Sequence, residues 1–164
     1  MINQMENKLA FAIVSFHKIY IKGLGGLLKT FGHSVPLECS NGNELIELLA
    51  THDLPDMAVI DFENTWRDEL INIAYLKQHY PSIKIISVYT EYDEAKTTEL
   101  IHNGIHGYMS KAEDTHMIKI ALQTIMQGAF YYPTISRDPF YPHPNRGLSK
   151  LEIRLMQIFS KLFS

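Results

Sequence analysis

The chain has 164 residues, of which 46% are hydrophobic, and its formal net charge at pH 7 is -3. This length is enough for one domain with a sizeable core and a short appendage. Lys and Arg are scattered, so no basic stripe indicates a nucleic-acid surface, and the single cysteine, Cys39, excludes an internal disulfide. No metal-binding Cys/His spacing and no apolar run of membrane length occur, so we expect a soluble cytoplasmic protein with no membrane association.

The first strand and helix are predicted from a change in apolar spacing. Leu9–Val14 is an apolar run of strand length, whereas the apolar residues after it are spaced as on one face of a helix that Gly32 ends. Gly23, Gly25 and Gly26 each cost such a helix roughly 1 kcal/mol relative to Ala. We therefore expect this helix to depend on packing more than on intrinsic propensity.

The central strand carries the first candidate functional residue. After a short strand at Val35–Cys39 and a helix capped by Asn41 or Asn43, Met57–Ile60 is a continuous apolar run, which is typical of a strand buried on both faces. Asp61 stands at its carboxyl end, where open α/β sheets place their ligand sites. A carboxylate in this position can be functional or can simply cap the following loop.

The same spacing rules predict five more elements in the second half of the chain. They are a helix over Asp68–Tyr80, a strand over Ile83–Tyr89, a helix from about Asp93 to Gly104, a strand over Gly107–Ser110, and a helix from Asp114 or Thr115 to Gly128. Five strands thus alternate with five helices. Because right-handed crossovers place helices on both faces of a parallel sheet, the fold class is α/β, with a doubly wound five-stranded parallel sheet.

The composition changes after Gly128. Residues 129–147 are rich in Pro, Tyr and Phe, which indicates a stiff linker, or a segment that folds back and covers its own domain. Ser149 and Glu152 form a capping-box pattern at the start of a further amphipathic helix. The predicted division is a domain at 1–128, a linker at 129–147 and one extra helix at 148–164, which we expect to pack on the domain, on a second copy or on residues outside this chain.

Four segments carry a resemblance to a known family: Gly42–Leu45, Pro55–Asp61, Gly104–Lys111 and Gly128–Tyr132. In this order they resemble the receiver domain of bacterial two-component response regulators, and more narrowly that of the LuxR/NarL-type transcription regulators. The resemblance implies a flavodoxin-like receiver fold. The residues from 148 onward are similar to the opening of the family's helix-turn-helix domain, of which we expect only the first helix in this truncated form.

The resemblance also implies roles for individual residues. In that family an aspartate at the sheet end accepts a phosphoryl group and a lysine after the fifth strand pairs with it, and Asp61 and Lys111 match these positions. The acidic pair that helps to hold Mg²⁺ falls on Ser15 and Phe16, and the hydroxyl residue that contacts the phosphoryl oxygens falls on Tyr89. The site is therefore interpreted as degenerate, and the alternative for Asp61 is a pair with Lys111 that only stabilises the sheet end.

The lost acidic pair bears on metal binding. Mg²⁺ prefers hard oxygen ligands and is usually held by one or two carboxylates, so we expect weak Mg²⁺ binding or none. Glu63, two residues after Asp61, is a candidate compensating carboxylate. The bulky Tyr89 and Phe16 are expected to hold the domain in one state without phosphate. Tyr108 either resembles the family's aromatic switch residue or is an edge-strand aromatic, half buried against the fourth helix.

These features favour a non-enzymatic signalling and interaction module in transcriptional control, an atypical response regulator with weak or no Mg²⁺-dependent phosphorylation at Asp61. One alternative is a phosphorylatable receiver in which Glu63 replaces the acidic pair, and another is a small enzyme on a flavodoxin-like fold. The turn Ser15–Lys18 disfavours the enzyme because it lacks the glycines that cradle a phosphate. Expected partners are a second copy, a sensor histidine kinase or another signalling protein, and DNA only if a longer product supplies the recognition helix.

Overall fold

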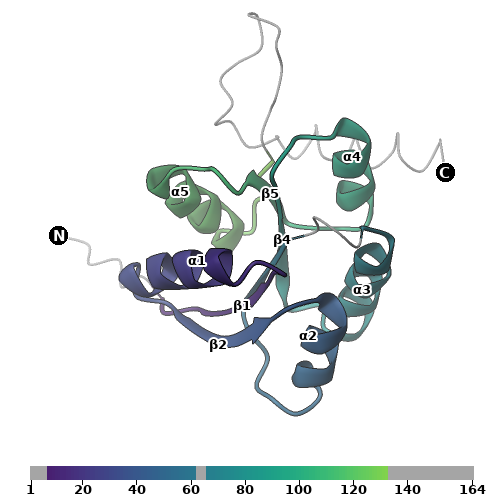
Figure 1. Ribbon diagram of the computed structural model, residues 1–164, viewed down its shortest axis with the longest axis horizontal. Coiled ribbons are helices and arrows are strands. Elements are labelled where there is room, and N and C mark those ends of the chain that lie inside the picture. Colours follow the sequence, from purple (N-terminus) through teal and green to yellow (C-terminus); the bar gives the residue numbers. More distant parts are fainter. Residues whose placement is uncertain (1–6, 62–65, 133–164) are drawn as a thin grey trace, which may run out of the picture. The chain divides into compact units, whose positions relative to one another are not determined.

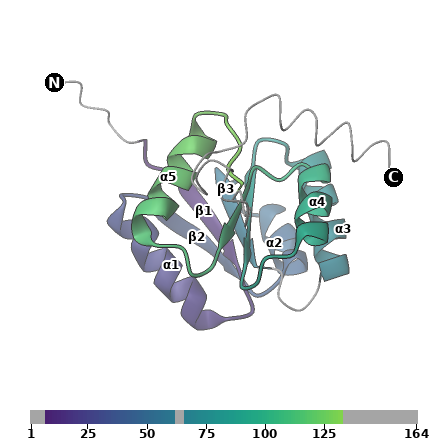
Figure 2. The same ribbon diagram turned by 90° about the horizontal axis from the view of Figure 1, so that it is seen from above.

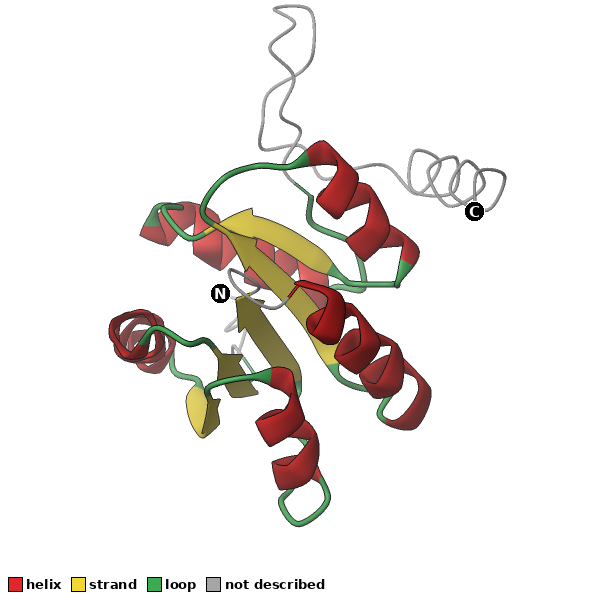
Figure 3. Ribbon diagram, turned by 45° about the vertical axis from the view of Figure 1, so that its right-hand side comes forward, coloured by secondary structure: helices red, strands yellow, loops and turns green. Residues whose placement is uncertain are grey.

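The computed structural model describes residues 7–61 and 66–132 (Figure 1). Strands and helices alternate along the chain, as Figure 3 shows by colour. They are β1 (Ala10–Val14), α1 (Lys18–Thr30), β2 (Ser34–Cys39), α2 (Gly42–Leu49), β3 (Met57–Asp61), α3 (Trp66–His79), β4 (Lys84–Tyr89), α4 (Glu94–His102), β5 (Gly107–Ser110) and α5 (Thr115–Met126). The strands form one parallel sheet in the order β2-β1-β3-β4-β5, which confirms the predicted fold class.

The described residues form two compact units, the first made of residues 7–61 and 66–84 and the second of residues 85–132. In the first unit β1 pairs in parallel with both β2 and β3. Helix α1 contacts β1 and β2, whereas α2 contacts α3, and Figure 2 shows α1 on the opposite side of these strands from α2 and α3. In the second unit β4 pairs in parallel with β5.

Polar caps and glycines set the helix ends where the sequence predicted them. The N-cap side chains of α2, α4 and α5 each accept a hydrogen bond from the backbone N–H three residues further on, at 2.9 Å for Asn41, 3.0 Å for Asp93 and 2.8 Å for Asp114. Asn41, not Asn43, therefore caps α2. Glycines with φ between +83° and +91° follow three helices, where a side chain would be strained: Gly32, Gly104 and Gly128.

The core follows the predicted apolar runs. Every residue of Met57–Ile60 is at most 2% exposed, so the expectation of a strand buried on both faces is confirmed. Helix α3 begins at Trp66, earlier than the predicted Asp68. Within the described ranges, no helix combines the length and the apolar character that a membrane span requires.

The chain returns along β5 after α5. In the second unit the Tyr108 N–H donates to the Tyr131 carbonyl at 2.8 Å, and the Tyr131 N–H donates to the His106 carbonyl at 3.0 Å. Tyr131 and Tyr132 are each 3% exposed. Tyr131 and Tyr132 therefore belong to the packed core, and the predicted division at residue 128 stays a prediction. The rest of the predicted linker and the predicted extra helix lie outside the described residues.

Candidate functional site

Asp61 and Ser15 lie side by side at the carboxyl ends of neighbouring strands in the first unit. Val14 of β1 is in register with Ile60 of β3, so the residues that follow them are adjacent. The Ser15 hydroxyl donates to Asp61 Oδ2 at 2.8 Å and accepts the His17 N–H at 3.0 Å. Ser15 is 1% exposed, so its hydroxyl is shielded from solvent. This hydroxyl links the Asp61 carboxylate to the His17 backbone N–H just before α1.

A tyrosine that the sequence did not single out interacts electrostatically with Asp61. Tyr20 lies in the first turn of α1 and is partly buried. Burial raises the pKa of the Tyr20 phenol, and the negative charge of Asp61 raises it further. The phenol therefore stays neutral beside the carboxylate. The signal in the sequence was a hydroxyl in an otherwise apolar stripe, one turn beyond the end of the first strand.

The two residues at the position of the acidic pair point in different directions. Ser15 is buried, whereas Phe16 is 74% exposed. Among the described ring contacts, the Phe16 ring makes one, an edge contact with the His17 ring at a centroid distance of 6.4 Å. Phe16 therefore does not fill space beside Asp61. That Tyr89 and Phe16 hold the domain in one state without phosphate stays a prediction.

Tyr89 belongs to an aromatic cluster in the second unit. Its ring lies 4.5 Å from that of Tyr108 and 6.0 Å from that of Tyr92, measured between centroids. Burial, with smaller contributions from Tyr108 and Glu113, raises the pKa of Tyr89 to about 12. Burial also raises the pKa of Tyr108, and a hydrogen bond with the Thr97 side chain opposes this rise. The cluster is therefore neutral at physiological pH.

Tyr108 is buried more deeply than the half-buried alternative predicted. It is 3% exposed, and Thr97 of α4, which is hydrogen-bonded to it, is 5% exposed. Tyr108 therefore packs between α4 and Tyr89. The sequence did not single out two members of this cluster, Thr97 and Tyr92. Nothing in the pattern of α4 distinguishes the buried Thr97 from its exposed neighbours, and Tyr92 lies in the loop before this helix.

Lys111 directly follows β5 in the second unit. Its backbone N–H donates to the Tyr89 carbonyl at 2.8 Å, which extends the pairing of β4 and β5 by one residue. Its side chain is partly exposed. Asp61 belongs to the first unit, so the pair between Asp61 and Lys111 stays a prediction, and Glu63 lies outside the described residues.

The donors beside Asp61 fit Mg²⁺ poorly. Where the resemblance predicts a carboxylate, the structure has the Ser15 hydroxyl, and this hydroxyl already makes two hydrogen bonds. In the part of the chain that the structure describes, no group of three or more His, Cys, Asp or Glu residues could hold a metal ion. Weak Mg²⁺ binding stays a prediction, because Glu63 is not among these residues.

Comparison with known proteins gives relatives at low identity. No family model matches the chain. It is similar to the transcriptional regulatory protein DegU of Brevibacillus brevis, with 24% identity over 135 residues that make up 81% of this chain and 57% of DegU. It is also similar to the transcriptional activator protein ExaE of Pseudomonas putida, with 22% identity over 94% of this chain and 75% of ExaE. The chain thus spans less than two thirds of the length of DegU.

Two solved structures that are similar to this chain are a response regulator and an isolated receiver domain. A LuxR-family two-component response regulator from Aurantimonas sp. SI85-9A1 has a TM-score of 0.69 and 18% identity, covering 94% of this chain and 99% of that one. The isolated receiver domain of RcsB from Salmonella enterica, in its apo form, has a TM-score of 0.70 and 23% identity, covering 77% of this chain and 94% of that one. These likenesses confirm the receiver fold that the sequence predicted.

Proposed function

We propose that this chain is the receiver part of a LuxR-type response regulator, a signalling and interaction module in transcriptional control with Asp61 at the phosphoacceptor position. The observation that carries this proposal is the placement of Asp61 at the carboxyl end of β3, held by the hydroxyl of Ser15 at 2.8 Å. The fold supports it, and so do the names of the similar proteins, which are transcription regulators.

The proposal includes atypical phosphorylation chemistry. Phosphoryl transfer depends mainly on positioning and on the neutralisation of charge, to which Mg²⁺ contributes most in this class of reaction. Ser15 brings no negative charge to hold the metal. In addition, the Ser15 hydroxyl donates a hydrogen bond to Asp61 Oδ2. A hydrogen bond to a charged group is worth about 1.5–3 kcal/mol, so it stabilises the carboxylate and makes this oxygen a weaker nucleophile. We therefore expect slow, weakly Mg²⁺-dependent phosphorylation or none.

The test is labelling with acetyl phosphate and Mg²⁺, followed by intact mass spectrometry. We expect little label on the unmodified chain, and Mg²⁺-dependent label on the triple variant Ser15→Asp, Phe16→Asp, Tyr89→Thr. Adding Asp61→Asn to the triple variant is the matched control and should remove that label. If the triple variant remains unlabelled, or if its label survives Asp61→Asn, Asp61 is not the acceptor position.

Efficient labelling of the unmodified chain at Asp61 would reject the atypical chemistry and favour the phosphorylatable alternative. Glu63→Ala should then abolish the label, since Glu63 would be supplying the lost carboxylate. If the phosphorylation chemistry is atypical, Glu63→Ala should leave the low level of label unchanged. The two versions of the proposal therefore predict different results for this variant.

The partners belong to the proposal as well. One similar solved structure is RcsB of Salmonella enterica bound to the promoter rprA, and another contains RcsB dimers bound to DNA. For this chain we propose a second copy and a sensor histidine kinase or other signalling protein as partners. DNA binding would need a recognition helix from a longer product, so a gel-shift series with these 164 residues should show no salt-sensitive binding.

A further inference from the structure

His106, just before the edge strand β5, accepts a main-chain hydrogen bond with its ring. The Ile85 N–H of β4 donates to His106 Nδ1 at 3.0 Å. A histidine nitrogen accepts only when it carries no proton, so the ring is neutral with its proton on Nε2. Ile85 is 0% exposed, so water cannot replace the ring as the acceptor. This hydrogen bond therefore exists only while His106 is neutral.

The same residue holds the segment in which the chain runs back along β5, which we call the return segment and define as Phe130–Tyr132. The His106 carbonyl accepts the Tyr131 N–H at 3.0 Å. The His106 ring stacks on the Phe130 ring, with centroids 5.8 Å apart and planes inclined by 2°, and Phe130 stacks in turn on Tyr132 at 6.1 Å. His106 thus connects the return segment to β4.

We propose that His106 makes the attachment of the return segment sensitive to acid: the neutral ring fixes the segment to β4, and protonation of the ring loosens it. A proton on Nδ1 would set two N–H donors against each other at 3.0 Å, so the ring must turn away from Ile85. This rotation also removes the ring from its stack on Phe130. Because residue 133 follows directly, His106 controls how firmly the chain is held where it leaves β5.

One interaction opposes this effect. A cation over an aromatic face is attracted to it, so the stack on Phe130 favours the protonated ring. However, the His106 side chain is partly exposed, where such an attraction is weak. Protonation leaves the buried Ile85 N–H without its acceptor, and an unsatisfied buried donor costs more than this attraction returns. The balance therefore favours loosening.

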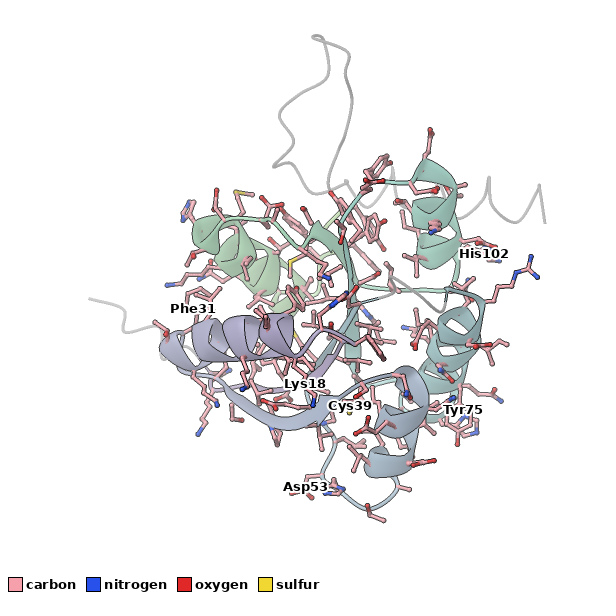
Figure 4. The ribbon with its side chains drawn as sticks, in the orientation of Figure 1. Lys18, Phe31, Cys39, Asp53, Tyr75 and His102 are labelled. Carbon is pink, nitrogen blue, oxygen red and sulfur yellow. The ribbon has the colours of Figure 1, made fainter. Side chains whose placement is uncertain are left out.

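The charges on the elements that contact His106 act mostly in the same direction. Lys84 directly precedes Ile85 in β4, and His102, labelled in Figure 4, is exposed in the last turn of α4. Both disfavour a further positive charge nearby when they are protonated. Glu99, one turn earlier on α4, has the opposite effect, but it is exposed and therefore screened. Residues 120–130 of α5 and the following turn contain no charged side chain.

Glu113 is a second titratable group beside the return segment. Burial, with smaller contributions from Glu113 and Asp114, raises the pKa of Tyr131 to about 12. Burial and Asp114 also raise the pKa of Glu113 itself. Because the Tyr131 phenol is neutral, loss of the Glu113 charge in acid removes no attraction to it. Replacing Glu113 therefore separates its titration from that of His106.

The direction of the pH dependence follows from proton uptake. The loosened state binds a proton more readily than the attached state, because only the attached state requires an unprotonated Nδ1. An unperturbed histidine titrates at about pH 6.5. The attachment is therefore strongest above this pH and weakens as the pH falls below it.

The experiment is amide hydrogen exchange of the full chain by NMR at about pH 7.5 and about pH 5, with each rate divided by that of the unstructured chain at the same pH. The Ile85 and Tyr131 amides should lose about tenfold of their protection in acid. The Val59 amide of β3 should keep its protection. The ¹⁵N shift of His106 Nδ1 should change from that of an acceptor to that of a protonated nitrogen over the same pH range.

Two substitutions separate the acceptor from the ring. His106→Asn keeps an acceptor oxygen at the position of Nδ1 but cannot take up a proton, so protection of the Tyr131 amide should become independent of pH. His106→Phe keeps a ring that can stack but has no acceptor, so the segment should be loosened at both pH values.

Two further substitutions are matched controls. The Leu9 N–H donates to His33 Nδ1 at 3.1 Å, which is the same kind of bond in the first unit. His33→Asn and Glu113→Gln should therefore leave the acid response of the Tyr131 amide unchanged. Circular dichroism at both pH values checks that each chain is folded.

Equal protection at both pH values in the unmodified chain would overturn the proposal, and so would an acid response that persists in His106→Asn or disappears in either control. If His106→Asn does not fold, the unmodified chain decides, because titration of Nδ1 and loss of Tyr131 protection at different pH values would also reject it. The inference needs neither Asp61 nor a phosphoryl group. Asp61→Asn should keep the full acid response, so this proposal and the proposed function fail independently.

Discussion

The contact between α2 and α3 makes Gly42 the most sensitive glycine of the first unit. The Gly42 N–H donates to Glu69 Oε1 at 3.0 Å. A Cβ atom on Gly42 would lie 2.6 Å from Glu69 Oε2, 2.6 Å from Asn72 Nδ2 and 3.0 Å from Asn72 Cβ. Glu69 and Asn72 are 2% and 6% exposed, so neither side chain can swing into water. Because Asn72 Cβ is fixed to the backbone of α3, the two helices must separate to accept an alanine.

The expected loss for Gly42→Ala is about 2–4 kcal/mol in the free energy of unfolding. Overpacking a fitted site costs about 1–3 kcal/mol. Weakening the buried hydrogen bond to the Glu69 carboxyl group costs up to about 1.5–3 kcal/mol, and the better helix propensity of alanine returns at most about 1 kcal/mol. For a protein of this size the melting temperature should fall by roughly 5–15 °C.

Urea unfolding followed by circular dichroism measures this loss. Gly23→Ala is the matched control, because its Cβ meets nothing within 4 Å, and it should raise the free energy of unfolding by about 0.5–1 kcal/mol. The same chemical change thus has opposite signs at the two positions. A Gly42→Ala chain as stable as the unmodified one, with an unchanged denaturant slope, would refute the close approach of α2 and α3.

Three further outcomes follow from buried polar groups. Tyr132→Phe should cost about 1–2 kcal/mol in urea unfolding, since the Tyr132 hydroxyl donates to the Ile105 carbonyl at 2.6 Å in a buried position; no loss would argue against this bond. Ser87→Ala should be neutral or stabilising in the same assay, because Ser87 Oγ is buried without a hydrogen-bond partner among the described residues; a loss above about 1 kcal/mol would reveal a hidden partner. Burial, with Glu44 and Glu38, raises the pKa of Cys39 to about 12, so its thiol should react with Ellman's reagent at pH 8 far more slowly in the folded chain than in urea.

The sequence determined the order and type of the elements. A continuous apolar run such as Met57–Ile60 is compatible only with burial on both faces, and helix ends at Asn41 and Gly32 follow from local backbone chemistry. Each of these signals involves only a few neighbouring residues, so it can be recognised in the sequence without the tertiary structure. The positions of Asp61 and Lys111 at strand ends follow from the same periodicity.

Tertiary structure decided where the neighbouring side chains point. Ser15 and Phe16 are adjacent in sequence, yet one is buried against Asp61, 46 residues away, and the other faces solvent. The burial of Glu69 against the start of α2 likewise depends on how two helices pack, because a carboxylate in the first turn of a helix is usually exposed. No local pattern encodes such contacts, since each depends on strands and helices brought together only when the sheet forms.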